Sequence, residues 1–214
     1  MGGKLEAMLL YIIALVGVAF FSVSGALAAG QKGFDWVGVI LIAVATALGG
    51  GTVRDVLLDR DMVFWITDPN YLLVTLAAAC GTLIYARHFR PPYRTLMIAD
   101  ALGLALFSIL GAEIALKLGV APIIVIAMGT VTGVFGGVIR DILVNDIPFI
   151  CRPSEPIYTT AAVLGIILYL ILTKFGAGRS VSLAVGITGI AALRTAGIIW
   201  KIRLPEFRVD GENL

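Results

Sequence analysis

Apolar residues fall into seven long runs along the chain, and short segments rich in glycine, proline and charge separate them. A helix needs about 20 such residues to cross a bilayer, because each residue advances it by about 1.5 Å and the hydrocarbon core is roughly 30 Å thick. The pattern therefore predicts seven membrane-spanning helices, over Met8–Ala29, Trp36–Val53, Tyr71–Ala86, Leu96–Leu116, Val120–Ile139, Ile157–Lys174 and Val181–Trp200.

The overall composition supports this interpretation. Apolar residues make up 59% of the 214 residues and charged residues 14%, whereas soluble domains average about 45–50% and about 25%. A chain of this size cannot bury so much apolar surface in its own core, so the excess must face lipid. This excludes a disordered chain, a secreted disulfide scaffold and a nucleic-acid-binding surface, and the net charge of +2 is too small to indicate a partner.

Lysines and arginines between the predicted helices are unequally divided between the two sides of the membrane. Six lie on the side of the N-terminus, and nine lie on the opposite side, which includes a cluster at 87–94 and a tail at 201–208. Because positively charged loops stay in the cytoplasm, we expect a multi-pass protein of the bacterial inner membrane, with its N-terminus outside and its C-terminus in the cytoplasm.

The sequence repeats itself at an offset of 86 residues. Residues 19–26 (AFFSVSGA) match residues 105–112 (ALFSILGA), and residues 50–58 (GGTVRDVLL) match residues 136–144 (GGVIRDILV). Each copy contains three predicted helices, an odd number, so the second copy enters the membrane from the opposite face. Many transport proteins are built from such inverted repeats, and a pathway across the bilayer explains the arrangement better than a structural role does.

We therefore expect an all-α polytopic membrane protein with a single transmembrane domain over residues 1–204. The first repeat would cover about residues 8–90 and the second about residues 94–176, while a seventh helix at about 180–200 belongs to neither copy. Residues 205–214 form a polar C-terminal tail.

Small residues mark the second and fifth predicted helices. They recur every four positions, a spacing that permits close helix packing. Consecutive glycines weaken a helix by about 1 kcal/mol each relative to Ala, which favours a kink or an opening beside a watery pathway; packing alone is the alternative. The residues that we predict to line such a pathway are Gly49, Gly50, Gly51, Gly133, Gly136, Gly137, Ser22, Ser24, Ser108, Thr52, Thr132 and Asp100.

An Arg-Asp pair follows the glycines in each copy, Arg54-Asp55 in the first and Arg140-Asp141 in the second. Charges that snorkel from a helix end to the membrane surface would explain a single pair. Because both residues are repeated after the glycines, we favour internal ion pairs that fix the helix or border a vestibule.

Other charged residues lie within the fourth and seventh predicted helices. An unpaired carboxylate at Asp100 would be costly in the membrane, so it should face water or a base such as Arg194. Glu113 and Lys117 are four residues apart and are expected to pair at the membrane surface. The sequence carries no recognisable nucleophile–base set, metal cluster or phosphate-binding loop, so we expect no enzyme activity, no cofactor and no metal.

These features resemble the trimeric intracellular cation (TRIC) channels, most closely their prokaryotic members. The resemblance covers residues 8–204 and rests on the three-plus-three-plus-one plan and on the paired Gly-Gly-x-x-Arg-Asp motifs. It implies a homotrimer in the lipid bilayer, with a pore in each subunit that conducts K⁺ and, to a lesser degree, Na⁺. The second and fifth helices would line this pore with help from the first and fourth.

Two features differ from the animal members of that family. These have Lys-Glu-Val where this chain has Arg54-Asp55-Val56, and they carry a voltage-responsive basic residue in the fourth helix, whereas Leu96–Leu116 contains none. A related bacterial branch is associated with glycine uptake. A secondary transporter of a small amino acid such as glycine is therefore the alternative function, in which a helix N-terminus would hold the carboxylate and Asp100 the ammonium.

Overall fold

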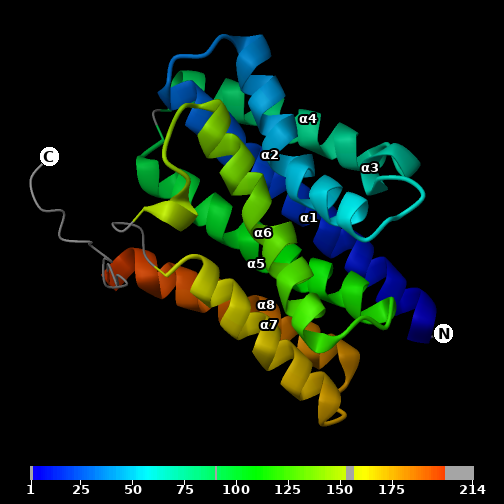
Figure 1. Cartoon of the computed structure of the whole chain (residues 1–214). Coiled ribbons are helices and arrows are strands. Elements are labelled where there is room, and N and C mark those ends of the chain that lie inside the picture. Colours follow the sequence, from blue (N-terminus) through cyan, green and yellow to red (C-terminus); the bar gives the residue numbers. More distant parts are fainter. Residues whose placement is uncertain (1, 90, 153–156, 201–214) are drawn as a thin grey trace, which may run out of the picture.

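Each of the seven predicted spans is a helix in the computed structural model, which describes residues 2–89, 91–152 and 157–200 (Figure 1). Within these residues, five helices are long and apolar enough to cross a membrane, α7 is shorter, and α4 does not reach the same apolar character. The predicted tail at 205–214 lies outside the described residues. The helices are α1 (Gly2–Gln31), α2 (Trp36–Leu57), α4 (Asn70–His88), α5 (Tyr93–Lys117), α6 (Pro122–Leu143), α7 (Thr159–Lys174) and α8 (Arg179–Trp200).

α2 and α6 end in the same way, although they belong to different repeats. Each is followed, two residues after its last residue, by a residue in the left-handed region, Asp59 at φ +49° and Asn145 at φ +56°. Asp and Asn adopt this conformation more readily than other non-glycine residues. A short helix that the sequence analysis missed then follows in each copy, α3 (Phe64–Thr67) in the first and the 3₁₀ helix η1 (Phe149–Cys151) in the second.

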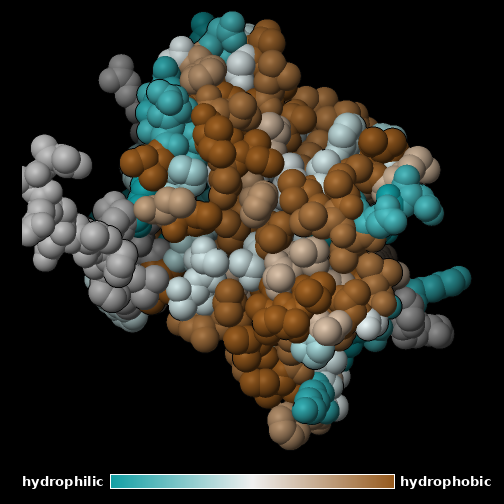
Figure 2. Space-filling model, viewed as in Figure 1, coloured by the Kyte–Doolittle hydropathy of each residue, from teal (hydrophilic) through white to brown (hydrophobic). Residues whose placement is uncertain are grey.

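The four helices α1, α2, α5 and α6 form the centre of the molecule, where α1 packs on α2 and α5 while α6 packs on α2 and α5. α4 covers α1 and α2 on one flank, and α7 and α8 lie together on the opposite flank against α5 and α6 (Figure 1). The outer face in Figure 2 is largely hydrophobic, and its most polar side chains gather towards the edges. Such a surface suits a surrounding of lipid tails.

A pair of inverted contacts joins α1 to α5. A methyl group at Gly17 would lie 2.5 Å from the ring of Phe107, and one at Gly103 would lie 2.8 Å from the ring of Phe21. Each glycine thus makes room for the phenylalanine of the other repeat, and the two rings meet edge to face at 5.4 Å. The repeat in the sequence is therefore also a repeat of contacts in space.

Candidate functional site

The central feature of the site is the crossing of α2 and α6, where backbone meets backbone. A methyl group at Gly50 would collide with the carbonyl oxygen of Thr132, and one at Gly136 would lie 2.5 Å from the carbonyl oxygen of Thr46. The two contacts are inverted copies of each other, and they show that the helices run antiparallel through the crossing. Small residues allow this close approach.

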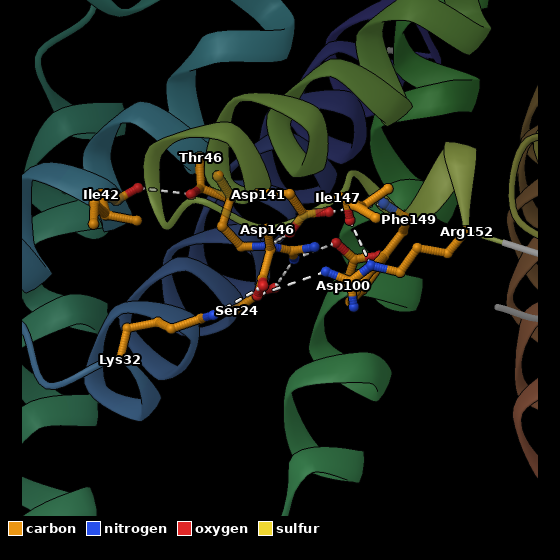
Figure 3. Close-up of polar contacts among 11 residues, drawn as sticks. Ser24, Lys32, Ile42, Thr46, Asp100, Asp141, Asp146, Ile147, Phe149 and Arg152 are labelled. Atoms are coloured by element: carbon orange, nitrogen blue, oxygen red, sulfur yellow. Dashed lines mark hydrogen bonds and ion pairs between the residues drawn. The ribbon is translucent and has the colours of Figure 1, made fainter. Parts of the chain in front are cut away.

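The expected opening of the helices at these glycines is wrong. α2 is helical without interruption from Trp36 to Leu57, and α6 from Pro122 to Leu143. The hydroxyl of Thr46 donates a 2.6 Å hydrogen bond to the carbonyl of Ile42, four residues earlier in its own helix (Figure 3). The hydroxyl of Thr132 does the same to the carbonyl of Met128 at 2.6 Å, as hydroxyls in apolar helices often do. Close packing across the crossing offsets the poor helix propensity of glycine, so no break is needed.

The other predicted glycines also face neighbouring side chains. Gly49 lies against Ile139 and Gly133 against the hydroxyl of Ser108, which has no hydrogen-bond partner among the described residues. The remaining two lie near the Arg-Asp pairs, with Gly51 against the ring of Phe64 and Gly137 against the hydroxyl of Tyr158.

Two predicted hydroxyl groups bond to elements beyond their own helix. Ser22 donates a 2.7 Å hydrogen bond to the carbonyl of Thr75, which ties α1 to α4. Thr52 donates to the carbonyl of Leu48 at 2.7 Å and accepts a hydrogen bond from Trp65 Nε1 at 3.1 Å. These hydroxyls anchor the segments around the crossing.

A charged cluster centred on Arg140 closes one end of the crossing. The fully buried guanidinium donates from Nε to Asp141 at 2.8 Å and from Nη1 to Asp100 at 2.6 Å and Ser24 at 2.5 Å (Figure 3). It also lies over the ring of Phe149, 4.5 Å from the centroid, in a cation–π contact. Residues from α1, α5, α6 and η1 thus meet around one cation, and several hydrogen bonds offset the cost of its burial.

A second cluster, centred on Arg54, lies beyond the other end of the crossing. Nε and Nη2 of Arg54 lie 2.8 and 2.7 Å from Oδ1 of Asp55, and Arg60 approaches the same oxygen at 3.2 Å. Oδ2 of Asp55 accepts the backbone N–H of Phe64 at 2.9 Å, as Asp141 Oδ2 accepts that of Phe149 at 2.8 Å. The two clusters therefore share an arginine, an aspartate and a phenylalanine in the same arrangement.

The clusters differ in what α1 and α5 contribute. The repeat equivalents of Asp100 and Ser24 are Ala14 and Leu110. Both line a cavity of about 390 Å³ together with Arg54, so the Arg54 end of the crossing holds an open pocket where the Arg140 end holds a carboxylate and a hydroxyl.

Three charged residues have partners that the sequence analysis did not name. Asp100 pairs with Arg140, whereas the guanidinium of Arg194 lies 4.5 Å from the ring centroid of Tyr158. Glu113 pairs with Lys117 at 3.6 Å as expected. Glu113 is nonetheless buried, because it also bonds to Tyr169 of α7 and Arg179 of α8. Spacing along one helix carries no signal for partners on such distant helices.

The fold and the crossing define a class of protein, a polytopic α-helical membrane protein made of two inverted halves. A family model described as "Glycine transporter" matches residues 11–87 and 97–174, once in each repeat. The UPF0126 inner membrane protein YadS of Escherichia coli is 38% identical over 95% of this chain and 98% of its own length. A UPF0126 membrane protein of Vibrio cholerae is 40% identical over 95% of this chain and 84% of its own.

Solved structures show the same fold. A TRIC channel orthologue from Rhodobacter sphaeroides is 41% identical with a TM-score of 0.86, over 91% of this chain and 99% of its own. A prokaryotic TRIC channel in 0.5 M KCl is 33% identical with a TM-score of 0.85, over 92% of this chain and 100% of its own. The chain belongs to this family, which joins the UPF0126 membrane proteins to the prokaryotic TRIC channel orthologues. A TRIC channel from C. elegans, 15% identical, shares the fold with a TM-score of 0.62.

These findings confirm the predicted family resemblance, the all-α polytopic class and the duplicated halves. The solved relatives are TRIC channels, in agreement with the expectation that the chain is not an enzyme.

Proposed function

We propose that the protein is a channel for monovalent cations, mainly K⁺, that works as a homotrimer in the bacterial inner membrane. Each subunit would hold its own pathway, formed by α2 and α6 with help from α1 and α5. The observation that carries this proposal is the backbone contact between α2 and α6 at the centre of two inverted halves. The likeness to prokaryotic TRIC channel structures over nearly the whole chain supports it.

The crossing has the chemistry that a weakly held cation needs. At Gly50 and Gly136 the nearest atoms of the facing helix are backbone carbonyls, so a small separation of α2 and α6 would expose backbone oxygen at these two points. Backbone carbonyls such as those of Thr46 and Thr132 would line the pathway together with hydroxyls. Neutral oxygen atoms can replace part of the hydration shell of an ion without trapping it.

We propose the orientation that the lysine and arginine count predicts, with the N-terminus and the Arg54 end outside and the Arg140 end in the cytoplasm. Cys151 of η1 is exposed and lies beside the Arg140 cluster, so it can report on this orientation. In a Cys80→Ser variant, a membrane-impermeant maleimide should label Cys151 in inverted vesicles and leave it unlabelled in intact cells. Labelling of intact cells would reverse the proposed orientation.

The channel proposal is tested by a salt gradient. Purified protein in planar bilayers under a KCl gradient should show discrete current steps and a reversal potential close to that of K⁺. A reversal potential near zero, or current without discrete steps, would refute a cation-selective channel. A mass measurement in detergent should give three copies per particle, and one copy would refute the trimer.

A secondary transporter of glycine is the second candidate, because the matching family model carries the description "Glycine transporter". Proteoliposomes should then take up labelled glycine in a saturable way that alanine inhibits. Linear uptake without saturation would count against a transporter, so the two experiments together separate the two functions.

A further inference from the structure

We infer that the cavity at Arg54 is a binding site for a small carboxylate, which takes the place that Asp100 occupies beside Arg140. The inference rests on the inverted repeat, because the second copy shows how this motif holds a carboxylate. In the first copy the same motif is present, but the chain supplies no carboxylate at the equivalent position, where Ala14 stands.

The guanidinium of Arg54 has bonding capacity left over. Nε and Nη2 are both directed to one oxygen of Asp55, and among the described residues no carboxylate or hydroxyl bonds to Nη1. In the second copy Nη1 of Arg140 is the atom that bonds to both Asp100 and Ser24. Arginine forms strong, charge-assisted hydrogen bonds to carboxylates. A ligand carboxylate at Arg54 Nη1 would thus complete the arrangement seen at Arg140.

The cavity has the size and access that such a ligand needs. Its volume of about 390 Å³ holds an acid of a few carbon atoms together with water. Ala14 and Leu110 form apolar wall where the second copy has polar side chains. Arg60 and Lys117 also line the cavity, and their side chains are 41% and 54% exposed, so the cavity is open to solvent.

The charges around the cavity favour a monoanion or a zwitterion over a free cation. The basic residues Arg54, Arg60 and Lys117 line it, together with two acidic residues. Glu113 is already bound by Lys117 and Arg179. Asp68 accepts the backbone N–H of Asn70 at 3.0 Å and is the acidic group left to face a ligand ammonium. The ligand class is therefore a small monocarboxylate, with or without an amino group.

The test measures binding and requires no ion flux, so its failure leaves the channel proposal intact, and a failed channel leaves this site intact. Purified protein in detergent is titrated with sodium acetate, glycine or methylammonium chloride at constant ionic strength, while its melting temperature and the heat of binding are recorded. Acetate and glycine should bind saturably and raise the melting temperature, and methylammonium chloride should do neither. No saturable binding of acetate or glycine would overturn the inference.

Two variants locate the site. Arg54→Gln should weaken acetate binding at least tenfold, because it removes the cation that holds the carboxylate. Ala14→Asp keeps Arg54 and places a carboxylate of the protein in the cavity, so it should abolish acetate binding. Because the new carboxylate can pair with Arg54, this variant should also melt at a higher temperature than Ala14→Asn, which has nearly the same shape and no charge. If Arg54→Gln does not fold, the two Ala14 variants still decide the question.

Gly81→Ala serves as the matched control, because nothing lies within 4 Å of the added methyl group; this variant should bind acetate like the unaltered protein. Acetate binding that survives both Arg54→Gln and Ala14→Asp would place the ligand elsewhere and overturn the assignment.

Discussion

The two ends of the α2–α6 crossing carry the same motif in different surroundings. Beyond Gly-Gly-x-x-Arg-Asp, both ends place an aspartate on the arginine and a phenylalanine ring beneath the guanidinium. At the Arg140 end, α1 and α5 add a hydroxyl and a carboxylate that bond to the guanidinium, and among the described residues they add no such bond at Arg54. The duplicated motif fixes the position of each arginine, and the residues that were not duplicated decide whether it is part of a closed cluster or faces an open pocket.

The largest effect is expected when the central cation of the closed cluster is removed. Arg140→Met would leave the buried carboxylates of Asp100 and Asp141 without their shared partner, which should cost about 3–5 kcal/mol of unfolding free energy. Arg54→Met should cost roughly half as much, because Arg60 still lies 3.2 Å from Asp55. Unfolding by SDS in mixed micelles measures both, and equal losses would show that the two ends are energetically alike.

The second prediction converts the closed end into a copy of the open one. Asp100→Ala reproduces the Ala14 of the first repeat and leaves Arg140 with Asp141, so we expect a loss of about 2–3 kcal/mol, somewhat below that of a fully broken pair. Acetate should then fill the space that Asp100 leaves and restore part of the stability. Asp100→Leu, which fills the same space, is the control and should show no rescue. Equal effects of acetate on both variants would contradict the equivalence of the two ends.

The sequence was sufficient to predict the features that depend on local pattern. The seven spans follow from runs of apolar residues, and the inverted halves follow from the offset of 86 residues. The long-range partners could not be predicted in this way. The Asp100–Arg140 pair joins two helices at positions where the repeat is imperfect, because the residue equivalent to Asp100 is Ala14. Arg194, the base named from the sequence, lies over the ring of Tyr158.

The loops after α2 and α6 also escaped prediction, because the repeat slips there. Asp55 bonds to the backbone of Phe64, nine residues on, whereas Asp141 bonds to that of Phe149, eight residues on. A comparison at fixed offset therefore misses the equivalence of the two rings. The glycines were recognised, but their low helix propensity suggested a break, and contact with the facing helix outweighs that propensity.

The third prediction concerns the crossing, where the two halves should respond alike. Gly50→Ala and Gly136→Ala both place a methyl group against a carbonyl oxygen of the facing helix, and overpacking of this kind costs about 1–3 kcal/mol. Both should also alter single-channel conductance, because they change the spacing of α2 and α6. Gly81→Ala is the control, since nothing lies within 4 Å of the added methyl group. Unequal losses in the two variants would show that the inverted symmetry fails at the crossing.

The smallest effect is expected at an exposed pair that has no counterpart at the other end. Lys32 Nζ lies 2.8 Å from Asp146 Oδ1, and Arg152 lies 3.6 Å from the other carboxylate oxygen. At the repeat-equivalent position, Arg60 lies in the loop after α2 and pairs instead with Asp55 of that helix. The hydrogen bond from Lys32 holds the pKa of the Asp146 carboxyl below its ordinary value. The ionised carboxylate therefore stabilises the fold at a pH above the ordinary pKa, and this stabilisation is lost as the pH falls through the lowered pKa.

Asp146→Asn should therefore cost less than about 1 kcal/mol at neutral pH, since exposed ion pairs contribute little. The cost should shrink in high salt, which screens exposed charges, and should disappear as the pH falls through the lowered pKa of the Asp146 carboxyl, because the unaltered side chain is then itself neutral. Asp59→Asn is the matched control, because no ion pair of Asp59 is present among the described residues and Asn tolerates its left-handed backbone. A cost that persists unchanged at low pH would show that Asp146 acts through packing and not through its charge.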